Sequence, residues 1–194
     1  MCFETNGKTN KIIPLNTQTQ YQNIVNQCKN IFFLKNKDYG TAWTIMRPSS
    51  LTDQLFIKAK RIRTLETTEA KVQENIENEY VGLINYSIMS LLVCDKEFQQ
   101  KYALENTSIP TQTLENLYDT KTKLPYETML AKNHDYGEAW REMRITSLTD
   151  LILAKILRTK QIEDNQYKTN ISEGVENNYI DIINYAIFSL ILLK

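Results

Sequence analysis

Apolar residues recur along most of the chain at the three- and four-residue spacing of a helix that packs on one face. The segment 19–35 shows this stripe clearly, at Ile24, Val25, Cys28, Ile31 and Phe32. The same spacing predicts further helices over 48–65, 67–93, 112–132, 147–163 and 166–193. The whole chain has only five Gly and four Pro, so we expect long helices and no strands.

Polar residues mark the predicted helix starts. Ser50 followed by Asp53 resembles a capping box, in which a hydroxyl accepts from a backbone amide in the first helical turn. Ser147 occupies the same place at the start of a later helix, and Thr67 or Thr68 is expected to cap the helix that reaches residue 93.

The pattern occurs twice. The segment from Lys35 to Arg61 recurs from Lys132 to Arg158, at an offset of 97 residues. A second block recurs at an offset of 99, where Glu74, Glu77, Asn78, Tyr80, Asn85 and Tyr86 match Glu173, Glu176, Asn177, Tyr179, Asn184 and Tyr185. One copy has a thin core by itself. The duplication therefore predicts a pseudo-symmetric pair that packs through its long third helices, as a two-fold dimer would.

The predicted fold is an all-α, tandem-repeat helical bundle with two pseudo-symmetric copies of about three helices each. We expect a loose leader over 1–16, repeat 1 over 17–95, a connector over 96–112 and repeat 2 over 113–194. The two repeats are expected to form one bundle, and a homodimer of the whole chain remains open.

The charge balance narrows the possible partners. Lys and Arg total 23, as do Asp and Glu, so no excess of positive charge supports direct binding to nucleic acid or to anionic membranes. Three widely spaced cysteines favour neither disulfides nor a zinc site. The start lacks the apolar core of a signal peptide, and the apolar stretch 180–193 is shorter than a membrane span. We expect a cytoplasmic protein.

The helix predicted over 166–193 carries acids and amides along one side of its middle. Glu173, Asn177, Asp181 and Asn184 lie within about 80° of one another at 100° per residue. This stripe is either a solvated helix face or a site for Mg²⁺, which takes one or two carboxylates, several waters and substrate phosphates. The candidate metal ligands are Asp150, Glu173, Glu176 and Asp181.

Two further features suggest a nucleotide site. Lys155 and Arg158 share a helix face and are either surface charges or a phosphate clamp opposite the acids. The segment 135–140 is either a helix-linking turn whose Trp140 enters the core, or a shelf on which a base stacks. The candidate nucleotide-binding residues are Lys132, Asp135, Tyr136, Trp140, Arg144, Lys155, Arg158, Asn177, Asn184 and Tyr185. Their equivalents in repeat 1, with those of the metal set, are Lys35, Asp38, Tyr39, Trp43, Arg47, Asp53, Lys58, Arg61, Glu74, Glu77, Asn78, Asn85 and Tyr86.

The combination of K-N-x-D-Y-G-x-A-W, S-L-T-D with Lys and Arg downstream, and D-I-I-N-Y-A-I resembles the nucleotide modification associated domain 1 family. The resemblance covers about 22–94 and 113–193, and it implies a helical domain linked to nucleotides or modified nucleotides. More distantly, the chain is similar to the all-α nucleoside triphosphate pyrophosphatases, MazG-like enzymes and dimeric dUTPases, which hold Mg²⁺ with E-x-x-E and E-x-x-D motifs. Asn178-x-x-Asp181 and Glu79-x-x-Gly82 stand where E-x-x-D would stand, each with one acid, and no E-x-x-E occurs on the helices before them.

The sequence is compatible with three functions. The first is an Mg²⁺-dependent nucleotide pyrophosphohydrolase, in which a metal-bound water attacks phosphorus while Lys155 and Arg158 stabilise the developing charge. The second is a module that binds a nucleotide without cleaving it. The third is a helical protein–protein adaptor without a small ligand. No Ser-His-Asp, Cys-His or Gly-rich phosphate-loop pattern points elsewhere.

Overall fold

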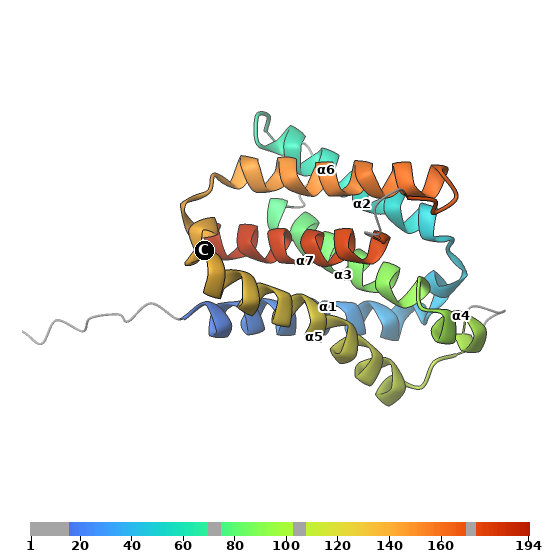
Figure 1. Cartoon of the computed structure of the whole chain (residues 1–194). Helices are drawn as coiled ribbons and strands as arrows, with labels where there is room; N and C mark the ends of the chain where they lie inside the picture. Colours follow the sequence, from blue (N-terminus) through green and yellow to red (C-terminus); the bar gives the residue numbers. More distant parts are fainter. Residues whose placement is uncertain (1–15, 70–74, 103–107, 170–173) are drawn as a thin grey trace, which may run out of the picture.

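The structure, a computed structural model, describes residues 16–69, 75–102, 108–169 and 174–194. Within these ranges the chain forms helices and no strand, as predicted (Figure 1). Its α-helices in these ranges are α1 Thr17–Tyr39, α2 Pro48–Leu65, α3 Ile76–Val93, α4 Lys96–Tyr102, α5 Thr111–Tyr136, α6 Ile145–Asp164 and α7 Val175–Leu192. Two short 3-10 helices, η1 Ala42–Ile45 and η2 Ala139–Glu142, follow α1 and α5.

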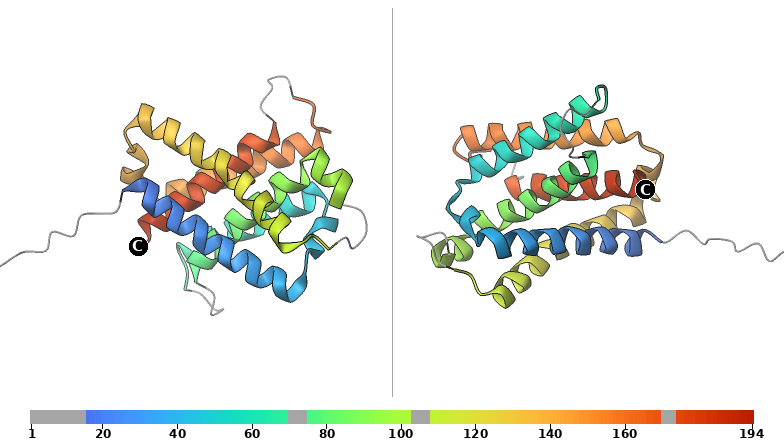
Figure 2. Two further views of the ribbon diagram at one scale, coloured as in Figure 1. Left: turned by 90° about the horizontal axis from the view of Figure 1, so that it is seen from below. Right: turned by 180° about the vertical axis from the view of Figure 1, so that it is seen from behind.

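The two repeats have the same order of elements. Repeat 1 runs α1, η1, α2 and α3, repeat 2 runs α5, η2, α6 and α7, and α4 lies between them in the chain. Figures 1 and 2 show three layers, with α2 and α6 on one side, α3 and α7 in the middle, and α1 and α5 on the other side. The tandem-repeat helical bundle is therefore confirmed.

The middle layer forms the core because α3 and α7 are apolar around almost their whole circumference. Tyr80, Leu83 and Ile88 of α3 are fully buried, as are their counterparts in α7, Tyr179, Ile182 and Ile187. Each such apolar side chain stabilises the fold by roughly 1.5–3 kcal/mol. The repeats pack through α3 and α7, and also through α2 and α6. No helix in the described ranges is both long and apolar enough to cross a membrane.

Hydrogen bonds exchanged between the repeats reveal the pseudo-two-fold symmetry in detail. The Tyr21 hydroxyl of α1 donates to Asn184 Oδ1 of α7 at 2.7 Å, and the Tyr118 hydroxyl of α5 donates to Asn85 Oδ1 of α3 at 2.9 Å. Each asparagine also donates from its amide nitrogen to a backbone carbonyl of the first helix of its own repeat. Each buried amide thus ties together both repeats.

A second reciprocal set lies between the outer and middle layers. The hydroxyls of Tyr80 and Thr149 are 3.0 Å apart, and Thr149 donates to Glu66 at 2.6 Å. The same three residue types meet across the other half of the interface, as Tyr179, Thr52 and Glu163. The interface is therefore symmetric in its polar contacts as well as in its apolar ones.

The predicted helix starts need correction. Arg47, not Ser50, is the N-cap residue of α2, because Pro48 fits the first helical position and needs no amide hydrogen. Arg144 likewise precedes α6, so Ser147 lies inside the helix. The capping-box prediction is therefore wrong in both repeats.

The long third helices are shorter than predicted at their starts. Thr67 and Thr68 lie in the turn after α2 and donate to the carbonyl of Thr64, whereas Asn75 caps α3 by accepting from the amide of Asn78. In repeat 2, α7 begins at Val175 rather than near residue 166. The predicted helices over 19–35 and 112–132 continue through Tyr39 and Tyr136 in α1 and α5. Most of the predicted leader, residues 1–15, lies outside the described residues.

Candidate functional site

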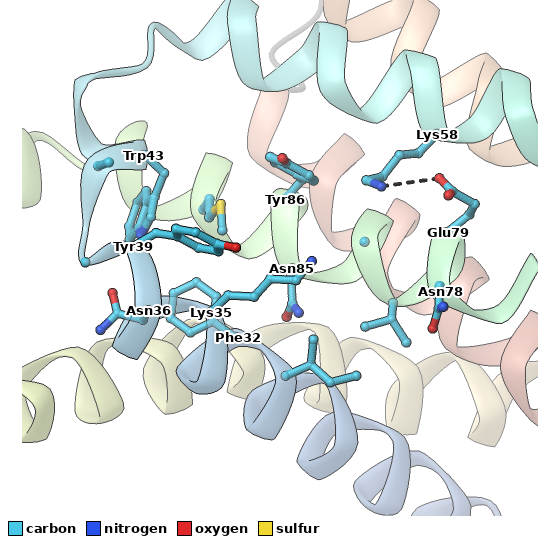
Figure 3. A pocket seen from close by; sticks show the side chains of 16 residues that line it. Phe32, Lys35, Asn36, Tyr39, Trp43, Lys58, Asn78, Glu79, Asn85 and Tyr86 are labelled. Atoms are coloured by element: carbon cyan, nitrogen blue, oxygen red, sulfur yellow. Dashed lines mark hydrogen bonds and ion pairs between the residues drawn. The ribbon is translucent and has the colours of Figure 1, made fainter. Parts of the chain in front are cut away.

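Each repeat contains a cavity of about 390 Å³ between the end of its first helix, the turn that follows, and the middle of its third helix. Figure 3 shows the cavity of repeat 1. Its lining includes Lys35, Asn36, Tyr39, Trp43, Lys58, Asn78, Glu79, Gly82, Asn85 and Tyr86. The cavity of repeat 2 is lined by the counterparts of many of these, including Lys132, Asn133, Tyr136, Trp140, Asp181, Asn184 and Tyr185.

The turn that follows the repeated D-Y-G sequence forms one wall of each cavity. Gly40 and Gly137 end α1 and α5 with positive φ angles of 64° and 60°, which glycine adopts without strain. Each glycine amide donates to the carbonyl four residues earlier, and the chain then turns back as η1 or η2. This turn brings a tryptophan against the third helix of its own repeat.

In repeat 2, Asp181 lies between two lysines. Its Oδ1 is 2.8 Å from Lys132 Nζ of α5, and its Oδ2 is 2.7 Å from Lys155 Nζ of α6. Burial would raise the pKa of the Asp181 carboxyl, but the two ammonium groups hold it below its usual value. The predicted acid and the predicted phosphate-clamp lysine therefore neutralise each other.

In repeat 1, the acid lies one helical turn earlier. Glu79, whose side chain is 4% exposed, accepts from Lys58 at 3.3 Å and also from Arg61. Gly82 occupies the position of Asp181, and the stem of Lys58 lies where its side chain would begin. In the described part of the chain, Lys35 forms no hydrogen bond or ion pair with any residue.

The two tryptophans also differ in their partners. Trp140 Nε1 donates to Asn133 Oδ1 at 3.1 Å, and its ring stacks on Phe188 with centroids 4.2 Å apart. In repeat 1, Trp43 stacks instead on Phe98 of α4, with centroids 5.8 Å apart. Within the described residues, Trp43 Nε1 and Asn36 Oδ1 are both buried and have no hydrogen-bond partner.

The structure gathers part of the predicted nucleotide set around the cavities. These residues are Lys35, Tyr39, Trp43, Lys58, Asn78, Asn85 and Tyr86 in repeat 1, and Lys132, Tyr136, Trp140, Asn184 and Tyr185 in repeat 2. Asp181, from the predicted metal set, lines the second cavity with them. Lys155 reaches the second cavity through Asp181, and Arg61 reaches the first through Glu79. Other predicted residues are exposed and line neither cavity: Asp38, Arg47, Asp53, Asp135, Arg144, Arg158 and Asn177.

The described members of the predicted metal set lie apart. Asp150 is exposed, with its Oδ1 3.5 Å from Arg63, and Glu176 is exposed in the first turn of α7. Glu173 and its repeat 1 equivalent Glu74 lie outside the described residues, and Glu77 is half-buried and lines neither cavity. Within the ranges that the structure describes, no three Asp, Glu, His or Cys side chains are grouped as metal ligands. These residues by themselves do not fit Mg²⁺, which stays a prediction of the sequence.

The sequence-based site omitted several lining residues. Asn36 and Asn133 line the cavities and are not in the predicted set, although both follow the first lysine of the repeated motif, and this repetition is a signal for them. Glu79 and Glu138 also lie outside the predicted set, and the equivalent positions of the other repeat are Asn178 and Thr41. Glu138 is nevertheless fixed by Thr17 at 2.5 Å and by Arg141 at 2.6 Å.

Comparisons with known proteins assign the chain to a family. No curated protein and no solved structure matches the chain. The sequence profile described as "Nucleotide modification associated domain 1" matches residues 35–93 and 132–193. These two regions make up more than half of the chain and contain most of the lining of both cavities. The chain therefore belongs to the nucleotide modification associated domain 1 family, with one copy of the domain in each repeat.

Proposed function

We propose that the protein binds a nucleotide or modified nucleotide in a repeat cavity and does not cleave it. The observation that carries this proposal is the pairing of aromatic faces with lysines around a cavity of about 390 Å³. In Figure 3, Tyr39, Trp43 and Tyr86 surround the same space, and Lys35 and Lys58 reach toward it from α1 and α2. A volume of this size suits a small ligand.

The chemistry of these side chains matches the two ends of a nucleotide. Aromatic side chains stack on bases of any sequence with about 1–3 kcal/mol per base. Lysine ammonium groups form strong, charge-assisted hydrogen bonds with phosphate oxygens. Tyr39 is 75% exposed, so its ring is accessible to a base that arrives from solvent.

Binding without hydrolysis is favoured because the acids near the cavities are already paired with basic side chains. Glu79 is engaged by Lys58 and Arg61, and Asp181 is engaged by Lys132 and Lys155. A carboxylate that is neutralised by two cations is a poor ligand for a divalent metal ion, because the metal must displace both. Magnesium-dependent pyrophosphohydrolysis therefore ranks second and is an outcome of the test below.

The test is calorimetry with a panel of ribo- and deoxyribonucleoside mono- and triphosphates, with and without Mg²⁺, followed by chromatography of each mixture. We expect at least one nucleotide to bind and to be recovered intact. Lys35→Ala should weaken its binding about tenfold or more, since a charge-assisted hydrogen bond contributes roughly 1.5–3 kcal/mol.

Lys37→Ala is the matched control, because Lys37 is an exposed lysine of the same helix that does not line the cavity. The Lys37→Ala variant should bind the nucleotide with the same affinity as the wild type. Absence of binding across the panel would refute the proposal. Mg²⁺-dependent release of monophosphate or pyrophosphate would replace it with hydrolysis.

A further inference from the structure

The cavities of the two repeats differ in whether the protein itself places an anionic group between the two lysines. In repeat 2 the carboxylate of Asp181 bridges Lys132 and Lys155 at 2.8 and 2.7 Å. The equivalent lysines of repeat 1, Lys35 and Lys58, both line the cavity, but the equivalent of Asp181 is Gly82. Repeat 1 therefore keeps the pair of cations and lacks the internal anion between them.

The surroundings of Gly82 show that the missing carboxylate changes the lysines. A Cβ atom at Gly82 would lie 2.6 Å from Cε and 2.7 Å from Cδ of Lys58, so the lysine stem occupies the place of the side chain. Lys58 Nζ turns to Glu79 at 3.3 Å, a contact that Glu79 shares with Arg61. Arg61 would keep Glu79 neutralised if Lys58 turned toward a ligand.

A second difference between the repeats points the same way. In repeat 2 the indole donor of Trp140 and the amide acceptor of Asn133 satisfy each other at 3.1 Å. In repeat 1 the donor of Trp43 and the acceptor of Asn36 are both buried at the cavity and have no partner among the described residues. Unpaired buried polar groups are costly, and a ligand with an acceptor and a donor of its own would satisfy both.

We infer that repeat 1 holds the ligand-binding site and that Asp181 occupies the cavity of repeat 2 in place of a ligand's anionic group. The ligand of repeat 1 carries a phosphate that bridges Lys35 and Lys58, as Asp181 bridges Lys132 and Lys155. It also carries a polar ring edge that pairs with Trp43 Nε1 and Asn36 Oδ1. That the ligand contains a nucleobase rests on the proposed function. The binding of its phosphate between Lys35 and Lys58 can be tested separately.

The experiment exchanges the residue types at the equivalent positions 82 and 181, where repeat 1 has glycine and repeat 2 has aspartate. Calorimetry with inorganic pyrophosphate and with the four deoxyribonucleoside triphosphates would compare the wild type with Gly82→Asp and Asp181→Gly. We expect one site per chain in the wild type. Gly82→Asp should weaken binding at least tenfold, because its carboxylate supplies the anion internally. Asp181→Gly should raise the stoichiometry to two sites per chain.

Gly174→Asp is the matched control, since it introduces the same side chain at a glycine with no atom within 4 Å of the new Cβ. It should leave affinity and stoichiometry unchanged, and circular dichroism should confirm that all variants remain helical. Two sites in the wild type, unchanged affinity in Gly82→Asp, or a single site in Asp181→Gly would each overturn the inference.

The two probes separate this inference from the proposed function. If pyrophosphate follows the expected pattern and no nucleotide binds more tightly than pyrophosphate, the anion site stands and nucleotide recognition falls. If nucleotides bind at two equivalent sites in the wild type, nucleotide binding stands and the assignment to repeat 1 falls. If neither probe binds, both fall.

Discussion

Asp181 illustrates how a single residue changes the chemistry of a duplicated site. Its side chain is 13% exposed and lies between Lys132 and Lys155. An acid held in this way fills the position between two cations, whereas in repeat 1 Gly82 carries no acid and the stem of Lys58 lies where a side chain would begin. The difference between the repeats is therefore electrostatic as well as steric.

The pairing of Asp181 predicts a pH dependence of stability. Its pKa in the folded protein is below the ordinary value of 3.8, so the unfolded chain takes up the proton first as pH falls. The ion pairs therefore stabilise the fold fully above about pH 4, and this contribution is lost as pH falls through the folded pKa. Asp181→Asn should lower the free energy of unfolding at pH 7 by about 1–3 kcal/mol.

Urea denaturation from pH 7 to pH 3 checks this expectation. The difference between the wild type and Asp181→Asn should shrink toward acidic pH. Glu176→Gln is the control, because Glu176 is an exposed acid of the same helix. A constant difference across this range would contradict the assignment of the ion pairs.

The sequence identified individual candidate side chains, and it did not identify the contacts between them. The sequence analysis set Lys155 opposite the acids of the following helix only as part of a hypothetical phosphate clamp, and it assigned Asp181 to a metal. The structure joins them directly, because opposite charges at this distance neutralise each other. Spacing within a helix gives the face on which a residue lies, and it does not give the partner opposite that face.

At the scale of elements, the long helices were predictable because their apolar stripes are continuous. The starts of α2 and α3 could not be predicted, because several Ser, Thr and Asn residues near each start can act as caps. Which of them does so depends on the tertiary structure. In this chain Asn75 caps α3, and no side chain caps α2. Helix α4 was missed since its seven residues are too short for a periodic pattern.

The contacts of α1 and α5 give a prediction at this scale. Tyr21→Phe and Tyr118→Phe should each lower the free energy of unfolding by about 1–3 kcal/mol, because each leaves a buried asparagine oxygen without its tyrosine donor. The two losses should be similar, since the contacts are related by the pseudo-symmetry.

Tyr126→Phe is the matched control, because the ring of Tyr126 packs on that of Tyr21 with centroids 5.4 Å apart. Within the described residues, the Tyr126 hydroxyl forms no hydrogen bond. It should change stability by less than about 0.5 kcal/mol. Denaturant titrations of the three variants measure these values, and equal losses in all three would refute the role of the inter-repeat bonds.

At the scale of the whole molecule, the duplication in sequence correctly predicted a pseudo-symmetric bundle. It did not predict that Tyr21 and Tyr118 would each bond to the opposite repeat, because similarity between two repeats gives no indication of which repeat a contact joins. The exchange became visible only in the fold, where α1 and α5 both pack against the middle layer.

This exchange predicts the behaviour of separated repeats. Chains of residues 1–102 and 108–194 should each lose most of their helical signal alone, because each exposes its side of the α3–α7 core. Mixing them should restore the circular dichroism of the intact protein and give a 1:1 complex by light scattering. A half that is fully helical and monomeric alone would contradict this picture.

The exchanged tyrosine–asparagine bonds also constrain how the two halves of the gene can diverge. The partners of these bonds are 163 and 33 positions apart in the chain, and in both pairs the tyrosine is encoded in one half and its asparagine in the other. A substitution at Asn85 therefore leaves Tyr118 without its partner, and a substitution at Asn184 leaves Tyr21 without its partner. The cavities have been able to drift apart, as Gly82 and Asp181 show, while the framework beneath them must change in coordinated pairs.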